Sequence, residues 1–252
     1  MMKKTRRIMS FLLISFAALA GLGATQEDAN ATLIHDYELN GSLADSLGGP
    51  SLIADGGTIG ATTYSFGANQ GLSLAYSALG STSLYSIEMV FEFDQFSIWR
   101  KIIDFNNRTT DDGFYYSPSN VLDFFPVVAG SSVVNTPIFV DVVLTRDAAT
   151  GSVSAYLNGV PQFSFIDSGG LAVFRGADNL VHFFEDDAAT GFNEASRGSA
   201  DCIRIYNNAL SASAVANLTS CSGGSTSVPE PGTLLLAALG LFALTVARRS
   251  SR

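Results

Sequence analysis

The sequence predicts an all-β fold, a two-sheet antiparallel sandwich with one short helix near its C-terminal end. Apolar and polar residues alternate over many short segments, and clusters of Gly, Asn, Asp and Ser separate these segments. Such alternation is typical of strands that bury one face, and the frequent turn residues are typical of antiparallel sheets. About 190 residues lie between the two hydrophobic chain ends, enough for one domain with a sizeable core.

The segment at 85–94 shows the alternation most clearly. Its apolar side chains share one face, whereas Glu88, Glu92 and Asp94 share the other, which we expect to be exposed to solvent. In chain order, strands are predicted at 33–39, 71–76, 85–94, 99–105, 121–125, 138–145, 151–157, 160–166 and 180–184.

Turns and one helix complete the predicted body, residues 32–219. Asn158 and Gly159 separate two strand segments and predict a tight hairpin, because both residue types tolerate positive φ angles. A helix is predicted at about 211–219, with Ser211 as its N-cap. Residues 220–228 are rich in Ser and Gly, which indicates a flexible linker.

Residues 1–31 have the layout of a secretory signal peptide. Four basic residues precede an apolar stretch at 8–24, and cleavage is expected after Ala24 or Ala31. We favour Ala31 because a strand-like pattern begins at Thr32. An uncleaved N-terminal anchor is the alternative.

Residues 229–252 form a second segment directed to a membrane. Their apolar part, 233–247, holds no charged residue, but as a helix it spans only about 22 Å, less than the roughly 30 Å of a bilayer core. It is therefore expected to hold the chain at the inner membrane only transiently. The residues that mark this tail are Val228, Pro229, Glu230, Pro231, Arg248 and Arg249. The tail resembles the PEP-CTERM sorting signal of Gram-negative bacteria, which implies processing near the Pro-Glu-Pro triplet by an exosortase.

The chain ends hold half of the basic residues. Of 14 basic and 23 acidic residues, seven basic and three acidic ones lie in the ends, so 32–228 keeps seven basic against twenty acidic residues, a net charge of −13. This charge excludes nucleic acid as a partner and disfavours adsorption to anionic lipid. Basic residues beside both apolar segments place both tips in the cytoplasm and the body outside.

Three motifs of the body resemble the laminin-G-like, concanavalin A-like jelly-roll domain of bacterial surface proteins. They are YELNGSLADS at 37–46, the hairpin from TRD at 145–147 to YLNG at 156–159, and DCIRIYNNALS at 201–211. The resemblance implies a jelly-roll sandwich over 32–219 and, as in many relatives, calcium at a rim of the sandwich.

Cys202 and Cys221 are the only cysteines, and an exported chain is able to keep a disulfide between them. Such a bridge closes a loop of about twenty residues and contributes roughly 3 kcal/mol. A buried free Cys202 and an unrelated Cys221 are the alternative. Without a Cys-x-x-Cys pair, and with His35 and His182 as the only histidines, the sequence gives no zinc ligand set.

No catalytic residue is assigned, and the chain is expected not to be an enzyme. The resemblance includes retaining glucanases, in which Glu-x-Asp is followed by a second Glu on one strand. Here Glu92-Phe93-Asp94 is followed by Gln, Phe and Ser. Glu88 lies about 13 Å from Glu92 along a strand, whereas a retaining pair needs about 5 Å.

Two acidic loop clusters are candidate calcium sites, because both are rich in oxygen donors and poor in cations. The first contains Asp104, Asn106, Asp111 and Asp112, and the second contains Asp178, Asn179, Glu185, Asp186 and Asp187. Solvated loops without an ion are the alternative.

A sugar-binding ledge is predicted beside the first cluster, because a pyranose has an apolar face for an aromatic ring and a polar rim for amides and carboxylates. The candidate residues are Trp99, Tyr116, Asn107 and Asp112.

Together these features predict an exported, non-enzymatic surface or matrix protein of a Gram-negative bacterium. Its expected partners are the export machinery, an exosortase and exopolysaccharide. A purely structural matrix component without a ligand and a divergent glycoside hydrolase are the alternatives.

Overall fold

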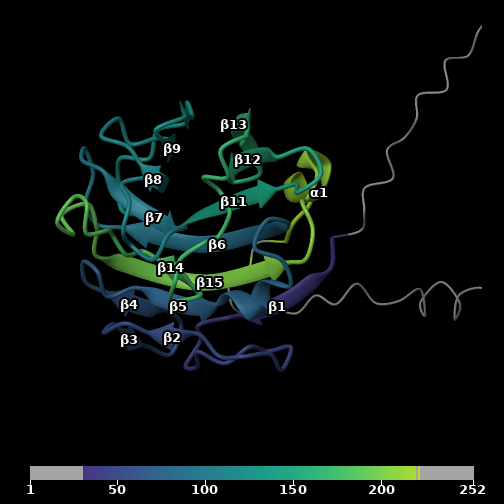
Figure 1. The fold of residues 1–252 in the computed structure, drawn as a ribbon. Coiled ribbons are helices and arrows are strands. Elements are labelled where there is room, and N and C mark those ends of the chain that lie inside the picture. Colours follow the sequence, from purple (N-terminus) through teal and green to yellow (C-terminus); the bar gives the residue numbers. More distant parts are fainter. Residues whose placement is uncertain (1–30, 220, 222–252) are drawn as a thin grey trace, which may run out of the picture.

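The computed structural model describes residues 31–219 and 221, which form a sandwich of two antiparallel sheets (Figure 1). The predicted signal segment other than Ala31, the sorting tail and the linker other than Cys221 lie outside the described residues. In the described part, no helix is long and apolar enough to cross a membrane.

The strands, in chain order, are β1 (Leu33–Tyr37), β2 (Ile53–Ala54), β3 (Thr58–Ile59), β4 (Tyr64–Phe66), β5 (Leu72–Ala75), β6 (Tyr85–Phe93), β7 (Arg100–Asp104), β8 (Gly113–Tyr116), β9 (Leu122–Phe125), β10 (Val128–Ala129), β11 (Val140–Arg146), β12 (Ser152–Leu157), β13 (Val160–Ile166), β14 (Leu180–Phe183) and β15 (Gly198–Tyr206). A 3₁₀-helix at Tyr76–Leu79 follows β5, and α1 (Ala212–Ala216) follows β15.

Each of the two sheets contains strands from early, middle and late parts of the chain. The eight-stranded sheet runs β13-β12-β11-β6-β15-β4-β3, with β1 also paired to β15. The seven-stranded sheet runs β10-β9-β8-β7-β14-β5-β2. The predicted fold class, an all-β sandwich of two antiparallel sheets with one short helix, is therefore confirmed.

The predicted hairpin turn and the predicted helix N-cap are both present. Asn158 and Gly159 have φ angles of 50° and 76°, as a tight hairpin requires. The Ser211 side chain accepts a hydrogen bond from the amide of Ala214, so it caps α1 as predicted, although α1 ends at Ala216. The strand β8 was not predicted, because its residues are all buried and show no alternation.

Aromatic rings fill much of the space between the sheets. Phe66 of β4 and Phe184 after β14 stack with centroids 4.8 Å apart, and Phe91 of β6 lies 5.0 Å from Phe184. All three side chains are buried. This contact between strands of opposite sheets holds the sandwich closed, since buried aromatic surface is a large stabilising term.

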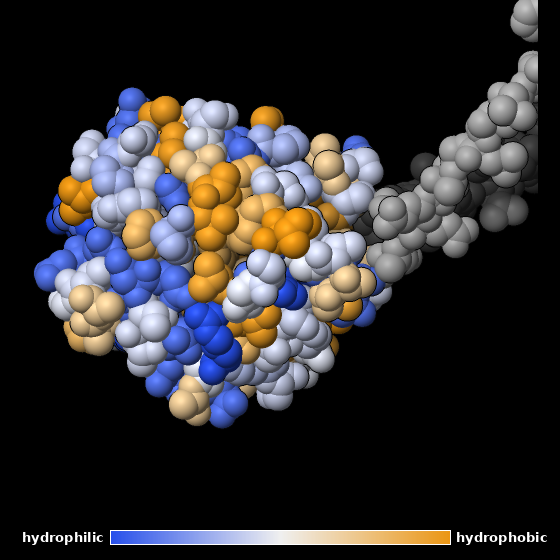
Figure 2. Space-filling view, turned by 45° about the horizontal axis from the view of Figure 1, so that its top comes forward, coloured by the Kyte–Doolittle hydropathy of each residue, from blue (hydrophilic) through white to orange (hydrophobic). Residues whose placement is uncertain are grey.

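The open edge of the sandwich carries exposed apolar residues. Figure 2 shows a band of hydrophobic side chains on the face turned forward from the top of Figure 1. The described residues at this edge that are more than two fifths exposed include Val127, Val133, Val160 and Ile166. The amide of Ser132 donates to the Gln162 side chain at 2.9 Å, so the segment after β10 is tied to β13 across the edge.

Glu88 does not face solvent, so the expectation of a solvated acidic face on β6 is wrong at this residue. It is fully buried, because residues of β15 cover it: Tyr206 donates its hydroxyl to Glu88 Oε2 at 2.8 Å, and Arg204 Nη1 lies 3.7 Å from Oε1. Burial raises the pKa of Glu88 from 4.5 to about 7, and the nearby Asp141 adds to the shift while Tyr206 and Arg204 oppose it.

Replacing Glu88 with Gln is expected to stabilise the protein in a pH-dependent way. The folded carboxyl holds its proton up to about pH 7 and the unfolded one only to about 4.5, so wild-type stability falls as pH rises through this window. Gln keeps the acceptor for Tyr206 without the buried charge. We expect Glu88→Gln to be more stable than wild type by about 2 to 3 kcal/mol at pH 8 and nearly equal to it at pH 4. Urea unfolding at both pH values measures this, and a gain that is the same at both would contradict it.

Candidate functional site

Two loops meet at β7 of the seven-stranded sheet, and both carry residues predicted as calcium ligands. One loop, 105–112, joins β7 to β8, and the other, 184–197, joins β14 to β15 and is the green loop at the left of Figure 1. The amide of Lys101 donates to the carbonyl of Glu194 at 2.8 Å, and the amide of Ala188 donates to the carbonyl of Arg108 at 2.9 Å. These bonds hold the second loop against β7 and against the first loop.

A buried lysine lies where the loops meet. Lys101 Nζ donates to Asp104 Oδ2 at 3.1 Å and to Asp187 Oδ2, and all three side chains are fully buried. The ammonium also lies 4.8 Å from the centre of the Tyr115 ring. A buried charge requires paired opposite charges, and these two carboxylates supply them. We name this group the acidic cluster. It consists of Lys101 and five carboxylates around it: Asp104, Asp111, Asp186, Asp187 and Glu194.

The carboxylates of the acidic cluster repel one another, and one of their oxygens has no hydrogen bond among the described residues. Burial raises the pKa of Glu194 to about 7, and repulsion from Asp111 adds to the shift. Burial and the neighbouring Asp187 raise the pKa of Asp111 as well. Among the described residues, none forms a hydrogen bond with Asp186 Oδ1, although this atom is buried.

In the first predicted calcium set, Asp104 and Asp112 already form hydrogen bonds or ion pairs with other residues of the chain. Asp104 Oδ1 accepts from the amides of Asn106 and Arg108 at 2.9 and 2.7 Å, while its other oxygen contacts Lys101. Asp112 pairs with Arg175 at 2.6 Å. Asp111 is exposed and belongs to the acidic cluster.

The second predicted calcium set is divided between two places. Asp186 and Asp187 belong to the acidic cluster, whereas Asp178 and Glu185 contact the two ring nitrogens of His182 at 2.7 and 2.8 Å. Asn179 is exposed, and its side chain donates to the carbonyl of Ala177. The division arises because successive side chains of an extended segment point in different directions. Calcium binding by either set stays a prediction.

The aromatic ledge is a group of three rings on the outward side of the seven-stranded sheet, beside the acidic cluster: Trp99, Tyr115 and Phe125. Trp99 is partly exposed, and its ring lies 5.6 Å from Tyr115 and 5.1 Å from Phe125, both edge to face. The Tyr115 hydroxyl lies 3.3 Å from Asp111 Oδ1. Asp123 lies opposite Tyr115 across β8 and β9, and burial raises its pKa to about 6. The Tyr115 ring is fully buried, so the exposed part of the ledge is formed by Trp99 and Phe125, with the carboxyl groups of Asp111 and Asp123 beside them.

Tyr116 does not belong to this surface. It points into the core between the sheets, with Phe93 5.9 Å away, because side chains alternate along β8 and its buried neighbour Tyr115 lies on the outward side of the sheet. Asn107 packs against Gly176, and Asp112 turns to Arg175. Of the four residues predicted for sugar binding, Trp99 is therefore the one in the ledge.

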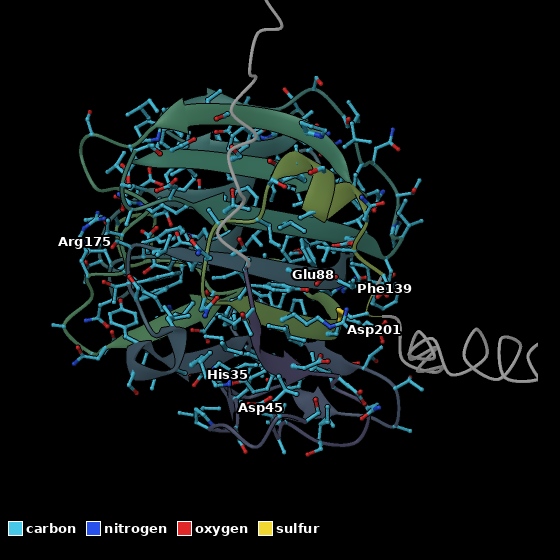
Figure 3. The ribbon with its side chains drawn as sticks, turned by 90° about the vertical axis from the view of Figure 1, so that its right-hand side faces the viewer. His35, Asp45, Glu88, Phe139, Arg175 and Asp201 are labelled. Carbon is cyan, nitrogen blue, oxygen red and sulfur yellow. A yellow bond between two sulfur atoms is a disulfide. The ribbon has the colours of Figure 1, made fainter. Side chains whose placement is uncertain are left out.

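A separate hollow of about 470 Å³ lies beside α1 on the eight-stranded sheet. Phe139 and Val215 give it apolar walls, and Asp141, Asn158 and Asp201 give it polar ones. Figure 3 shows Phe139 and Asp201 at the right and Arg175, which contacts the loop of the acidic cluster, at the left. The hollow lies on the eight-stranded sheet and the ledge on the outward side of the seven-stranded sheet, so the two are separate.

The described part of the chain has a disulfide between Cys202 of β15 and Cys221, with Cα atoms 6.0 Å apart. Both residues are buried, and they pack with Val90 of β6. This bridge ties the last described residue to the centre of the eight-stranded sheet.

The two-sheet sandwich and the match to a family model together define the class of the protein. The family model Laminin_G_3, described as the concanavalin A-like lectin/glucanases superfamily, matches residues 66–216, and the chain belongs to this family. The PEP-CTERM protein-sorting motif matches residues 227–251, so the chain is exported and processed at the membrane. No curated protein sequence matches the chain.

Solved structures with a similar fold include domains of glycan-active proteins. Domain 4 of AbnA, an extracellular GH43 arabinanase from Geobacillus stearothermophilus in complex with arabinotriose, is 19% identical, with a TM-score of 0.52 over 74% of this chain and 98% of that chain. Trypanosoma rangeli sialidase is 17% identical, with a TM-score of 0.54 over 75% of this chain. The match spans 32% of the sialidase chain. At these identities the likeness concerns the fold alone.

Proposed function

We propose that this protein is a non-enzymatic surface or matrix protein that binds a neutral polysaccharide through the aromatic ledge. The single observation that carries the proposal is the position of the partly exposed Trp99 beside Tyr115 and Phe125, with Asp111 and Asp123 at its margin. A sugar ring stacks its apolar face on an aromatic ring, and the carboxyl groups accept hydrogen bonds from its hydroxyls.

The charge of the body favours a neutral polysaccharide over an anionic one. Residues 32–228 carry a net charge of −13, which repels uronic acids, phosphates and sulfates. The arabinanase domain of similar fold is in complex with arabinotriose, a neutral oligosaccharide. We therefore take neutral exopolysaccharide as the ligand class.

The sorting motif fits this role. After export, an exosortase would process the chain near Pro229, Glu230 and Pro231 while 233–247 holds it at the inner membrane, and the sandwich would then reach the cell surface or the extracellular matrix. There the ledge would join the protein to exopolysaccharide.

Two alternatives make different predictions. A glycoside hydrolase needs a carboxylate pair in a cleft, and the raised pKa of Glu194 beside Asp111 makes the acidic cluster the place to test it. A purely structural component would neither bind nor cleave. Incubation of the full chain with neutral polysaccharides, followed by assay of reducing ends, separates the enzyme from the other two.

Replacing Trp99 with Ala is expected to weaken binding of the full chain to a neutral polysaccharide at least about tenfold, because about 1.4 kcal/mol of ring contact is lost. Affinity electrophoresis in gels that contain the polysaccharide measures the change. The control is Phe139→Ala, which removes a 43% exposed ring from the separate hollow and should change affinity less than twofold. Loss of binding in Phe139→Ala but not in Trp99→Ala would move the site to the hollow and contradict the proposal.

A further inference from the structure

Three neighbouring strands of the seven-stranded sheet end close together. Asp55 follows β2, Gly71 precedes β5, and Glu185 lies two residues after β14. The amide of Asp55 donates to the carbonyl of Gly71 at 3.0 Å. A Cβ atom at Gly71 would overlap the carbonyl oxygen of Phe183 and lie 2.8 Å from Glu185 Cγ. Because residue 71 has no side chain, Asp55 and Glu185 approach each other across it.

His182 of β14 completes a compact group with these carboxylates. One oxygen of Asp55, one oxygen of Glu185 and one nitrogen of His182 all lie within 4.8 Å of one another. His182 and Glu185 are buried, and Asp55 is exposed, so the group has an opening to solvent.

Glu185 has an unused oxygen in this group. Its Oε2 contacts His182 Nδ1 at 2.8 Å and Arg108 Nη1 at 3.3 Å. Its Oε1 is buried and has no hydrogen-bond partner in the described part of the chain, and the residue is 0% exposed. A buried carboxylate oxygen without a partner is costly, so it points to a ligand with positive charge.

The histidine is oriented as metal-binding histidines commonly are. His182 Nε2 contacts Asp178 Oδ2 at 2.7 Å, and a carboxylate on one ring nitrogen fixes the ring and leaves the other nitrogen for a metal. That other nitrogen, Nδ1, faces Glu185.

The charges around the group match a divalent ion. Asp55, Asp178 and Glu185 supply three negative charges, and Arg108 supplies one positive charge. The two negative charges that remain equal the charge of a divalent cation bound beside a neutral imidazole.

We propose that Asp55, His182 and Glu185 bind a divalent transition metal ion of the zinc class. An imidazole nitrogen with two carboxylate oxygens suits zinc and its neighbours, whereas calcium and magnesium prefer oxygen ligands alone. On binding, the metal takes the position of the proton between His182 Nδ1 and Glu185, and that proton leaves to solvent. Sequence analysis placed Glu185 in a candidate calcium set but did not connect it with Asp55 and His182, because Asp55 lies far along the chain and only the pairing of β2, β5 and β14 brings them together.

Calorimetric titration of the full chain with zinc chloride tests the proposal. The chain must carry no polyhistidine tag, because His35 and His182 are its only histidines and His35 is bonded to Asp45 and to the carbonyl of Ala78. We expect one zinc ion per chain and a higher melting temperature with zinc. Asp55→Asn changes an exposed side chain, so it should fold normally and weaken zinc binding at least about tenfold.

Asp94→Asn is the matched control, since it also removes an exposed carboxylate, here from the surface pair with Arg197. It should bind zinc as wild type does. The proposal is overturned if wild type takes up no zinc, if Asp55→Asn binds as tightly as wild type, or if calcium at equal concentration displaces the zinc. None of these results depends on polysaccharide binding.

Discussion

Replacing Lys101 with Met is expected to lower the free energy of unfolding by about 3 to 5 kcal/mol, because two buried carboxylates lose their cation. Lys101, Asp104 and Asp187 are fully buried, and Lys101 is the only lysine among the described residues. No other lysine is therefore available to neutralise the two carboxylates. Chemical denaturation at pH 7 measures the loss.

The matched control for Lys101→Met is Arg197→Met. Arg197 pairs with Asp94 at 3.0 Å, but its side chain is 67% exposed and that of Asp94 is 40% exposed. An exposed pair of this kind contributes at most about 1 kcal/mol, and we expect Arg197→Met to stay within that limit. Equal losses in the two variants would mean that Lys101 is not a buried counter-charge.

Replacing Cys221 with Ser is expected to cost about 3 kcal/mol, the second largest effect. The bridge joins residues 19 positions apart, and closing a loop of this size restricts the unfolded chain by roughly that amount. The bridge also fixes the segment that contains α1, whose Val215 packs on Val143 and Tyr156 of the eight-stranded sheet. Thermal and urea unfolding of the oxidised proteins measure the loss.

Reduction supplies the control for the disulfide. Wild type in the presence of a thiol reductant should lose the same stability as Cys221→Ser, and the variant should not respond to the reductant. A wild-type protein that keeps its full stability after complete reduction would refute the expected contribution.

Much of the fold could be predicted from the sequence, because a strand with one buried and one solvent-exposed face shows alternating apolar and polar residues. The alternation in 85–94 located β6, and Asn158 with Gly159 located the hairpin between β12 and β13. Short strands such as β2, β3 and β10 escaped prediction, because two residues are too few to show a period. Glu88 was misjudged because its cover comes from Tyr206, which is distant along the chain.

The candidate site was harder to predict, because its parts come from separate segments. The acid-rich loops at 104–112 and 178–187 were visible in the sequence. The basic residues that pair with their carboxylates, Lys101, Arg175 and His182, became clear only from the strand pairing and loop contacts of the structure. Trp99 was predicted to bind sugar because it is the only tryptophan and precedes an acidic loop; the structure leaves it partly exposed, and its role stays a prediction. The choice between Tyr115 and Tyr116 depends on which face of β8 points outward, and a continuous buried run of residues does not reveal it.

The central claim, that a neutral polysaccharide lies on the aromatic ledge, is tested most directly by the fluorescence of Trp99, the only tryptophan of the chain. Acrylamide quenching is measured on the full chain with and without saturating neutral oligosaccharide. The account predicts that the bound sugar shields Trp99, so quenching falls along the same concentration curve as binding. Saturated binding with unchanged quenching of Trp99 would contradict it.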